Sequence, residues 1–181
     1  MTTDALVQTS LIGFDNGARF SPCGRYRYTL WRLWGHGPRV NFLMLNPSTA
    51  DCIDNDPTVE RCERRAKAWG YDGLLVTNLF AYRSTDPSKL RAVEDPVGGV
   101  ENNQAILETA LRSALVVCAW GNDGALFGRN REVLEILKPV HERLAALRLT
   151  NEGHPYHPLY VPYSVEPVAF RGIPKVRSGD Q

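Results

Sequence analysis

Short apolar runs alternate with longer mixed segments along most of the chain. The apolar runs are residues 40–45, 74–79 and 115–119, with a further candidate at 147–150. Nearly continuous apolar runs of this length are typical of strands that are buried on both faces of a sheet. Loops and helical segments lie between the runs, so the pattern predicts βαβ units with parallel strands.

Helix signals are clearest after the first of these runs. Asp56 and Pro57 form an N-cap and first-turn pair, and Gly70 can end the helix, which therefore runs to about Trp69. Further helices are predicted over residues 102–111 and 130–137, and residues 141–147 are a candidate for another.

An additional strand is expected before the first apolar run. Residues 26–34 are rich in aromatic and β-branched side chains and partly alternate in polarity. A turn over residues 35–38 then leads into the run at 40–45. The two segments are interpreted as a hairpin at the start of the sheet.

These elements predict one α/β domain over residues 1–181, with a core at about 25–165 and a loose tail at 166–181. Its expected architecture is a three-layer α/β/α sandwich around a central, mostly parallel four-stranded sheet. A hydrophobic content of 43% is ordinary for a globular protein.

Charge and cysteine usage narrow the class of protein. Lys and Arg number 21 against 20 Asp and Glu, so the chain as a whole is not attracted to nucleic acid. This charge balance does not exclude a local basic cleft. Cys23, Cys52, Cys62 and Cys118 match no familiar zinc spacing and are interpreted as reduced thiols. No signal peptide and no membrane span is evident, so we expect a cytoplasmic protein, a monomer without a membrane partner.

Polar loops follow the predicted strands, where open parallel sheets bind ligands. The loops are residues 46–56, 78–83, 120–124 and 153–160. They lack the glycine-rich patterns that cradle phosphates, and their Asn, Asp, His and aromatic residues suit a flat polar ligand. A zinc site at His154 and His157 lacks a third ligand, so neither metal nor cofactor is expected.

Each candidate residue also has a plain structural interpretation. Asn46 could belong to an ordinary turn, and Asn78 could bond only to backbone. Burial is the better interpretation of Trp120. Functionally, Asn78 could read a base edge, because an amide offers a donor and an acceptor side by side.

The order of these motifs resembles the uracil-DNA glycosylase superfamily. An apolar strand is followed by Asn46-Pro47, a second by Asn78, a third by Trp120-Gly121, and a late loop begins at His154-Pro155. Residues 25–160 also resemble a widespread bacterial family classed as a domain of unknown function. That likeness includes Asn46-Pro47-Ser48-Thr49-Ala50-Asp51 and Asn78-Leu79-Phe80-Ala81-Tyr82-Arg83.

The glycosylase resemblance implies a uracil-DNA-glycosylase-like fold and hydrolysis of the N-glycosidic bond of a flipped base in DNA, for repair or phage defence. The implied catalytic residues are Asn46 to position water, Asp51 as a nearby carboxylate (with Asp56 as its alternative), and His154 or His157 to stabilise the leaving base. The implied base-binding residues are Pro47, Ser48, Asn78, Phe80, Tyr82 and Trp120. The implied DNA-backbone contacts are Arg83, Arg61, Lys175 and Arg177, whereas Arg64 and Arg65 could equally form a solvated helix face.

This sequence departs from the superfamily pattern at three places. Leu45 replaces the residue that usually stands just before Asn46. Ser48 and Thr49 stand where an aromatic residue often restricts base size, so the pocket is expected to accept a larger or modified base. Tyr156 and His157 interrupt the small residues of the late loop. Two other interpretations stay open: a nucleotide-binding or nucleic-acid-binding module without catalysis, and a hydrolase of free nucleosides or nucleotides.

Overall fold

A mixed β-sheet runs through the protein. The computed structural model describes residues 6–9, 15–48, 50 and 54–172. Its strands are β1 (Leu6–Thr9), β2 (Asn16–Phe20), β3 (Arg27–Leu33), β4 (Arg39–Met44), β5 (Gly73–Asn78), β6 (Leu115–Cys118), β7 (Leu144–Ala146) and β8 (Val168–Ala169). Its helices are α1 (Pro57–Ala68), α2 (Gly99–Leu111) and α3 (Arg129–Ile136), with short 3₁₀ helices η1 (Pro87–Arg91), η2 (Asn122–Gly128), η3 (Lys138–Arg143) and η4 (Pro158–Tyr160).

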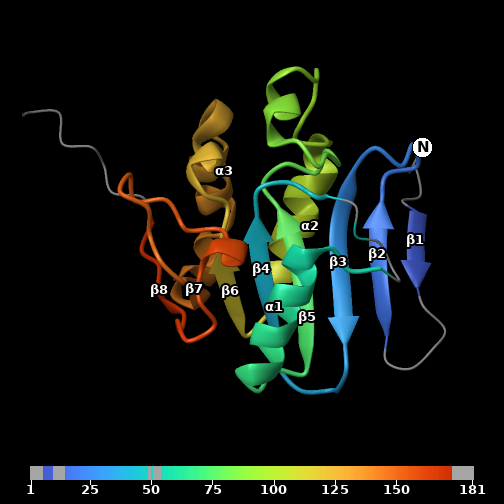
Figure 1. Cartoon of the computed structure of the whole chain (residues 1–181). Coiled ribbons are helices and arrows are strands. Elements are labelled where there is room, and N and C mark those ends of the chain that lie inside the picture. The colour runs from blue at the N-terminus through green and yellow to red at the C-terminus, as the bar shows by residue number, and fades with distance from the viewer. Residues whose placement is uncertain (1–5, 10–14, 49, 51–53, 173–181) are drawn as a thin grey trace, which may run out of the picture.

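The sheet has eight described strands in the order β1-β2-β3-β5-β4-β6-β7-β8 (Figure 1). The four inner strands β5, β4, β6 and β7 are parallel, and the pairings outside them are antiparallel. The predicted four-stranded sheet was therefore wrong. The parallel centre exists, but antiparallel strands at both sides, which carry weaker sequence signals, double its size.

The predicted hairpin over residues 26–45 is also wrong. β3 pairs with β5 in antiparallel register, with Leu30 opposite Val76, and β5 lies between β3 and β4. Asp72 explains this arrangement. Its carbonyl accepts a hydrogen bond from the Trp34 amide at 3.0 Å, and its amide donates to the Pro38 carbonyl at 2.8 Å. The turn after β3 is therefore bonded to the residue that precedes β5, and β3 pairs with β5 instead of β4.

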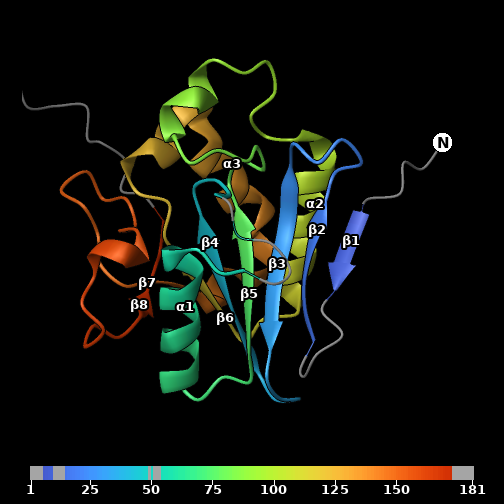
Figure 2. The ribbon, with the colours of Figure 1, turned by 45° about the vertical axis from the view of Figure 1, so that its right-hand side comes forward.

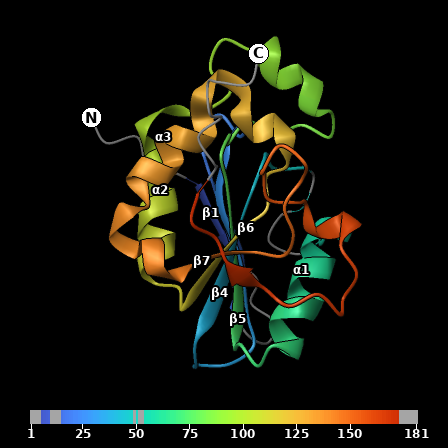
Figure 3. The same cartoon turned by 90° about the vertical axis from the view of Figure 1, so that its left-hand side faces the viewer.

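The helices form two layers around the sheet. α1 covers one face, and α2 and α3 cover the other (Figure 3). α1 starts as predicted, because the Asp56 carboxylate caps it by accepting from the Val59 amide at 2.8 Å and Pro57 occupies its first turn. The short helix η4 lies beside α1 (Figure 2).

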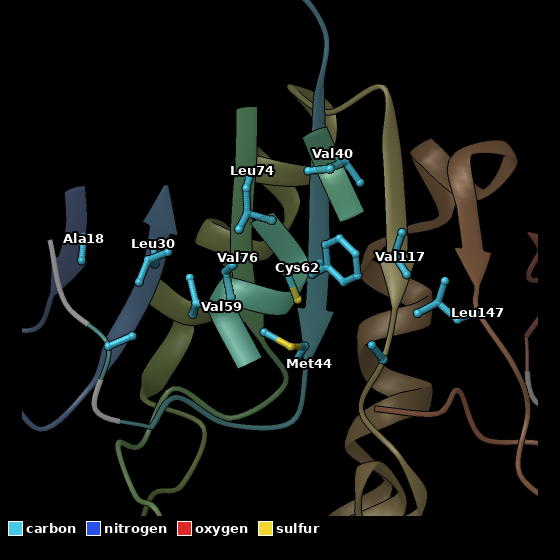
Figure 4. Close-up of a cluster of buried hydrophobic side chains, with 14 of the residues drawn as sticks. Ala18, Leu30, Val40, Met44, Val59, Cys62, Leu74, Val76, Val117 and Leu147 are labelled. Carbon is cyan, nitrogen blue, oxygen red and sulfur yellow. The ribbon is translucent and has the colours of Figure 1, made fainter. Parts of the chain in front are cut away.

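Two apolar clusters hold these layers to the sheet. One joins the sheet to α1 through side chains that include Phe42, Val59 and Cys62 (Figure 4). The other joins it to α2 and α3 through Leu43, Ile106 and Val133. Because β4 contributes to both clusters, its side chains are buried on both faces, as its continuous apolar run predicts.

The C-terminal part of the fold differs from the prediction. The fourth parallel strand is β7 at 144–146 rather than 147–150. Residues 141–146 form the end of the 3₁₀ helix η3 and this strand, so the candidate helix over 141–147 was wrong. The segment 166–172, expected to be loose, contains β8, which pairs with β7. Phe170 after β8 is buried against Trp120, with 5.9 Å between ring centroids.

Candidate functional site

The carboxyl ends of the parallel strands open into a cavity of about 730 Å³. In the sheet, Leu43 is level with both Thr77 and Cys118, so β4, β5 and β6 end together. The cavity is lined by the loop after β4, the start of α1, the loop after β6 and the segment 150–160. A volume of this size suits a small organic ligand such as a nucleoside.

Asn46 lies in this cavity wall with its amide held in one orientation. Nδ2 donates to the Ser84 carbonyl at 2.8 Å and to the Pro47 carbonyl at 3.2 Å. Both N–H groups are thus engaged by backbone, and Oδ1 accepts no hydrogen bond from the described residues. The side chain is therefore a fixed acceptor, which can orient a water molecule but cannot deprotonate it.

Asp56 brings a carboxylate to the same cavity. One oxygen, Oδ1, caps α1 at the Val59 amide, and the side chain also lines the cavity wall. Because a carboxylate can accept at both oxygens, capping leaves Oδ2 as an acceptor for a ligand or water.

His157 is the histidine that lines the cavity. The Leu159 amide donates to its Nδ1 at 3.4 Å, which leaves the proton of the neutral ring on Nε2. Burial lowers the pKa of His157 to about 4, although the nearby Asp56 charge acts in the opposite direction. The imidazole is therefore neutral at pH 7 and offers an N–H donor.

His154, the other candidate, lies elsewhere. It is 9% exposed, its Nδ1 is 3.5 Å from Asn130 Nδ2, and its backbone bonds to Thr150. It is not among the residues that line the cavity. The structure thus separates the two histidines, with His154 bracing the late loop and His157 facing the ligand space.

The Trp120-Gly121 pair links the third strand to this loop. Gly121 donates to the Pro155 carbonyl at 2.7 Å and has a φ of +68°, which favours glycine. Trp120 lines the cavity and is only 2% exposed, in agreement with the expected burial. Two motifs 34 residues apart, at Gly121 and Pro155, therefore form one wall.

The predicted base-binding residues are only partly brought together. Ser48 lines the cavity, and Pro47 is buried beside it. Asn78 and Phe80 are both buried and do not line it, and Tyr82 lines a neighbouring cavity instead. Asn78 Nδ2 is buried without a hydrogen-bond partner among the described residues.

The arginines of α1 differ from their predicted roles. Arg61 donates to the Pro158 and Val161 carbonyls at 2.9 and 2.8 Å, so its guanidinium holds the η4 segment to α1. Arg65 is 1% exposed and donates to the Val161, Pro162 and Val165 carbonyls. Arg65 on a solvated face was therefore wrong, whereas Arg64 is exposed beside Glu60.

Three predicted site residues, Asp51, Lys175 and Arg177, lie outside the described residues. Within the described part of the chain, no group of three or more His, Cys, Asp or Glu side chains could hold a metal ion. The helices of that part are all too short or too polar to cross a bilayer. Cys23, Cys62 and Cys118 are unpaired, and the last two are buried.

Several cavity residues were missed from the sequence. Arg27 is a buried guanidinium in the wall that donates to the Ala50 carbonyl at 2.7 Å, and it stands in a strand without any motif. Asn122 and Glu152 are joined at the rim by a hydrogen bond of 2.6 Å. Their polar loops were visible as candidates, but the pairing joins two loops that no local pattern connects.

Taken together, the fold and the site define an α/β protein with a polar ligand cavity at the carboxyl ends of parallel strands. The chain belongs to a protein family of unknown function, DUF1643, whose model matches residues 27–159. It matches no curated protein and no solved structure. The membership agrees with the expected family likeness, and no match supports the expected relationship to uracil-DNA glycosylases.

Proposed function

We propose that the protein is a DNA base glycosylase, which hydrolyses the N-glycosidic bond of a flipped base held in the 730 Å³ cavity. The observation that carries the proposal is that Asn46, Asp56 and His157 all line the same cavity. These side chains supply a fixed acceptor, a carboxylate and a neutral N–H donor, and hydrolysis of this bond can use one of each.

The first requirement is an oriented water. Asn46 Oδ1 accepts a hydrogen bond from the water and holds it against the anomeric carbon, and Asp56 Oδ2 takes its proton as the new C–O bond forms. Asp56, the alternative to Asp51 for this role, is chosen because it lines the cavity. Its charge also stabilises the cationic sugar of the transition state.

The second requirement is stabilisation of the leaving base. As the C–N bond breaks, its electron pair moves onto the base, and negative charge collects on a base oxygen or nitrogen. The Nε2–H of neutral His157 donates to that atom. A neutral donor keeps its own proton, so the base leaves as a stabilised anion and is protonated afterwards by water.

The direct test is release of a free base. Single-stranded and duplex oligonucleotides that contain uracil, hypoxanthine, a thymine mismatch or a bulky modified cytosine are incubated with the protein. Abasic sites are then detected by alkaline strand cleavage, and the released base by mass spectrometry. We expect release from at least one substrate and its loss in Asn46→Ala, with Arg112→Gln, an exposed change on the opposite end of the sheet, as control.

The same experiment separates the two other candidate functions. Hydrolysis of free nucleosides or nucleotides without action on any oligonucleotide would identify a nucleoside-type hydrolase. Nucleotide binding with no hydrolysis of any substrate would identify a binding module. Either outcome would contradict the glycosylase proposal.

A further inference from the structure

A second cavity of about 420 Å³ adjoins the first. The two share Ser48, Ser84 and Thr85 in their common wall, so a ligand that fills the first can extend into the second. Arg25, Arg83 and Lys89 line the second cavity. Arg25 lies in the connection between β2 and β3, and Arg83 and Lys89 both lie in the connection between β5 and α2, the latter in η1.

The charge of this second cavity is of one sign. No Asp or Glu is among the described residues that line it. A third cavity of about 300 Å³ gives the contrast, because Asp15 and Glu108 line it together with its arginines. A cavity lined by cations and hydroxyl groups favours an anion, and phosphate is the anion attached to nucleosides.

The guanidinium of Arg83 is held in one orientation at this cavity. Its Nη1 donates to the Gly24 carbonyl at 3.1 Å, and its guanidinium lies 4.8 Å from the centroid of the Phe20 ring. Its Nη2 has no partner among the described residues. Because backbone and ring contacts fix the plane of the group, little rotamer entropy is lost when an anion binds.

We propose that the second cavity is a phosphate subsite and that the substrate of the first cavity is phosphorylated. The inference rests on the proposed function, since it places the base in the first cavity, and it deepens that function by excluding unphosphorylated nucleosides as the preferred substrate. The sugar of the reacting nucleotide lies at the shared wall of Ser48 and Ser84, and Arg25, Arg83 and Lys89 contact the phosphate.

The test measures binding, so it does not depend on turnover. A fluorescein-labelled single-stranded 12-mer of thymidylate is titrated with protein at several salt concentrations. Each lost phosphate contact lowers the slope of log K against log salt by about 0.7 for a single strand. We expect this reduction in Lys89→Gln and in Arg25→Gln, both exposed side chains whose loss leaves the fold intact, and about twice the reduction in the double variant. Arg112→Gln removes the same charge at the other end of the sheet and is expected to keep the wild-type slope.

Competition identifies which phosphate occupies the subsite. If thymidine 5′-monophosphate displaces the 12-mer much better than thymidine does, and the advantage disappears in Lys89→Gln, the phosphate belongs to the reacting nucleotide. If only oligonucleotides show the Lys89 effect, the phosphate belongs to a flanking nucleotide. Both results support the subsite.

Wild-type slopes in the Arg25 and Lys89 variants would overturn the inference, and so would failure of the wild-type protein to bind the 12-mer at low salt. Binding with the expected slopes but without base release would contradict only the glycosylase proposal. Base release at rates and salt dependence that are unchanged in the variants would contradict only the subsite.

Discussion

The side-chain amide of Asn46 donates a 2.8 Å hydrogen bond to the main-chain carbonyl of Ser84, 38 residues further along the chain. Ser84 in turn donates to the Pro47 carbonyl at 2.9 Å. The loops after β4 and β5 are therefore locked together at the cavity. The lock also determines the chemistry of Asn46, because it turns both N–H groups to the backbone and leaves only the oxygen as an acceptor.

This lock predicts that an aspartate cannot replace Asn46. In Asn46→Asp, a carboxylate oxygen faces the Ser84 and Pro47 carbonyls, and the Ser84 carbonyl loses its donor. We expect the free energy of unfolding to fall by about 1–3 kcal/mol, measured by urea denaturation, and base release to fall although a carboxylate is the stronger base. Asn46→Ala serves as the control, because it removes the donor without adding repulsion. Wild-type stability of Asn46→Asp would contradict the orientation of the amide.

The parts of the fold that follow from the sequence are those with local causes. β4 and β5 are mostly apolar, and α1 has its cap at Asp56, so pattern alone predicts them. The pairing of β3 with β5 has a non-local cause, since the turn at 34–38 is held by Asp72. No periodicity within residues 26–45 could reveal that.

The site shows the same division. Asn46 was predictable as a polar residue that ends a buried strand. The choice between His154 and His157 was not, because both stand beside prolines in one loop and differ only in which one Asn130 and Thr150 contact. The burial of Arg65 could not be predicted either, because the carbonyls that accept its hydrogen bonds lie 96–100 residues further along the chain.

The lowered pKa of His157 predicts a specific dependence of stability on pH. Its folded-state pKa is about 4 against an ordinary 6.5, so between these pH values His157 is protonated in the unfolded chain and neutral in the folded protein. The contribution of neutral His157 to the free energy of unfolding is complete above pH 6.5. It is lost as the pH falls towards 4, by up to about 3 kcal/mol. Urea unfolding at pH 7, 6, 5 and 4.5 should show this loss in the wild type and a shallower one in His157→Gln. Equal slopes in the two proteins would contradict a neutral, half-buried imidazole.

Arg61 gives a test of structural against DNA-binding roles. Arg61→Ala removes the guanidinium hydrogen bonds to the Pro158 and Val161 carbonyls and is expected to reduce the free energy of unfolding by about 1–3 kcal/mol. The neighbouring Arg64→Ala removes an exposed ion pair and should cost less than about 0.5 kcal/mol. Oligonucleotide binding by Arg61→Ala should keep the wild-type salt slope. A lowered slope would show that Arg61 contacts phosphate after all.

Asp56 is proposed both to cap α1 and to accept the proton of the attacking water, and two substitutions separate these roles. Asparagine caps helices about as well as aspartate, so Asp56→Asn should unfold within about 0.5 kcal/mol of the wild type, whereas Asp56→Ala should lose about 1 kcal/mol. Base release should fall by about 10²–10⁴-fold in both, because both lack the carboxylate. Since Asp56 raises the pKa of His157, the asparagine variant should also show a still lower His157 pKa by NMR titration. Full base release by a well-folded Asp56→Asn protein would remove Asp56 from the mechanism and leave it only the helix cap.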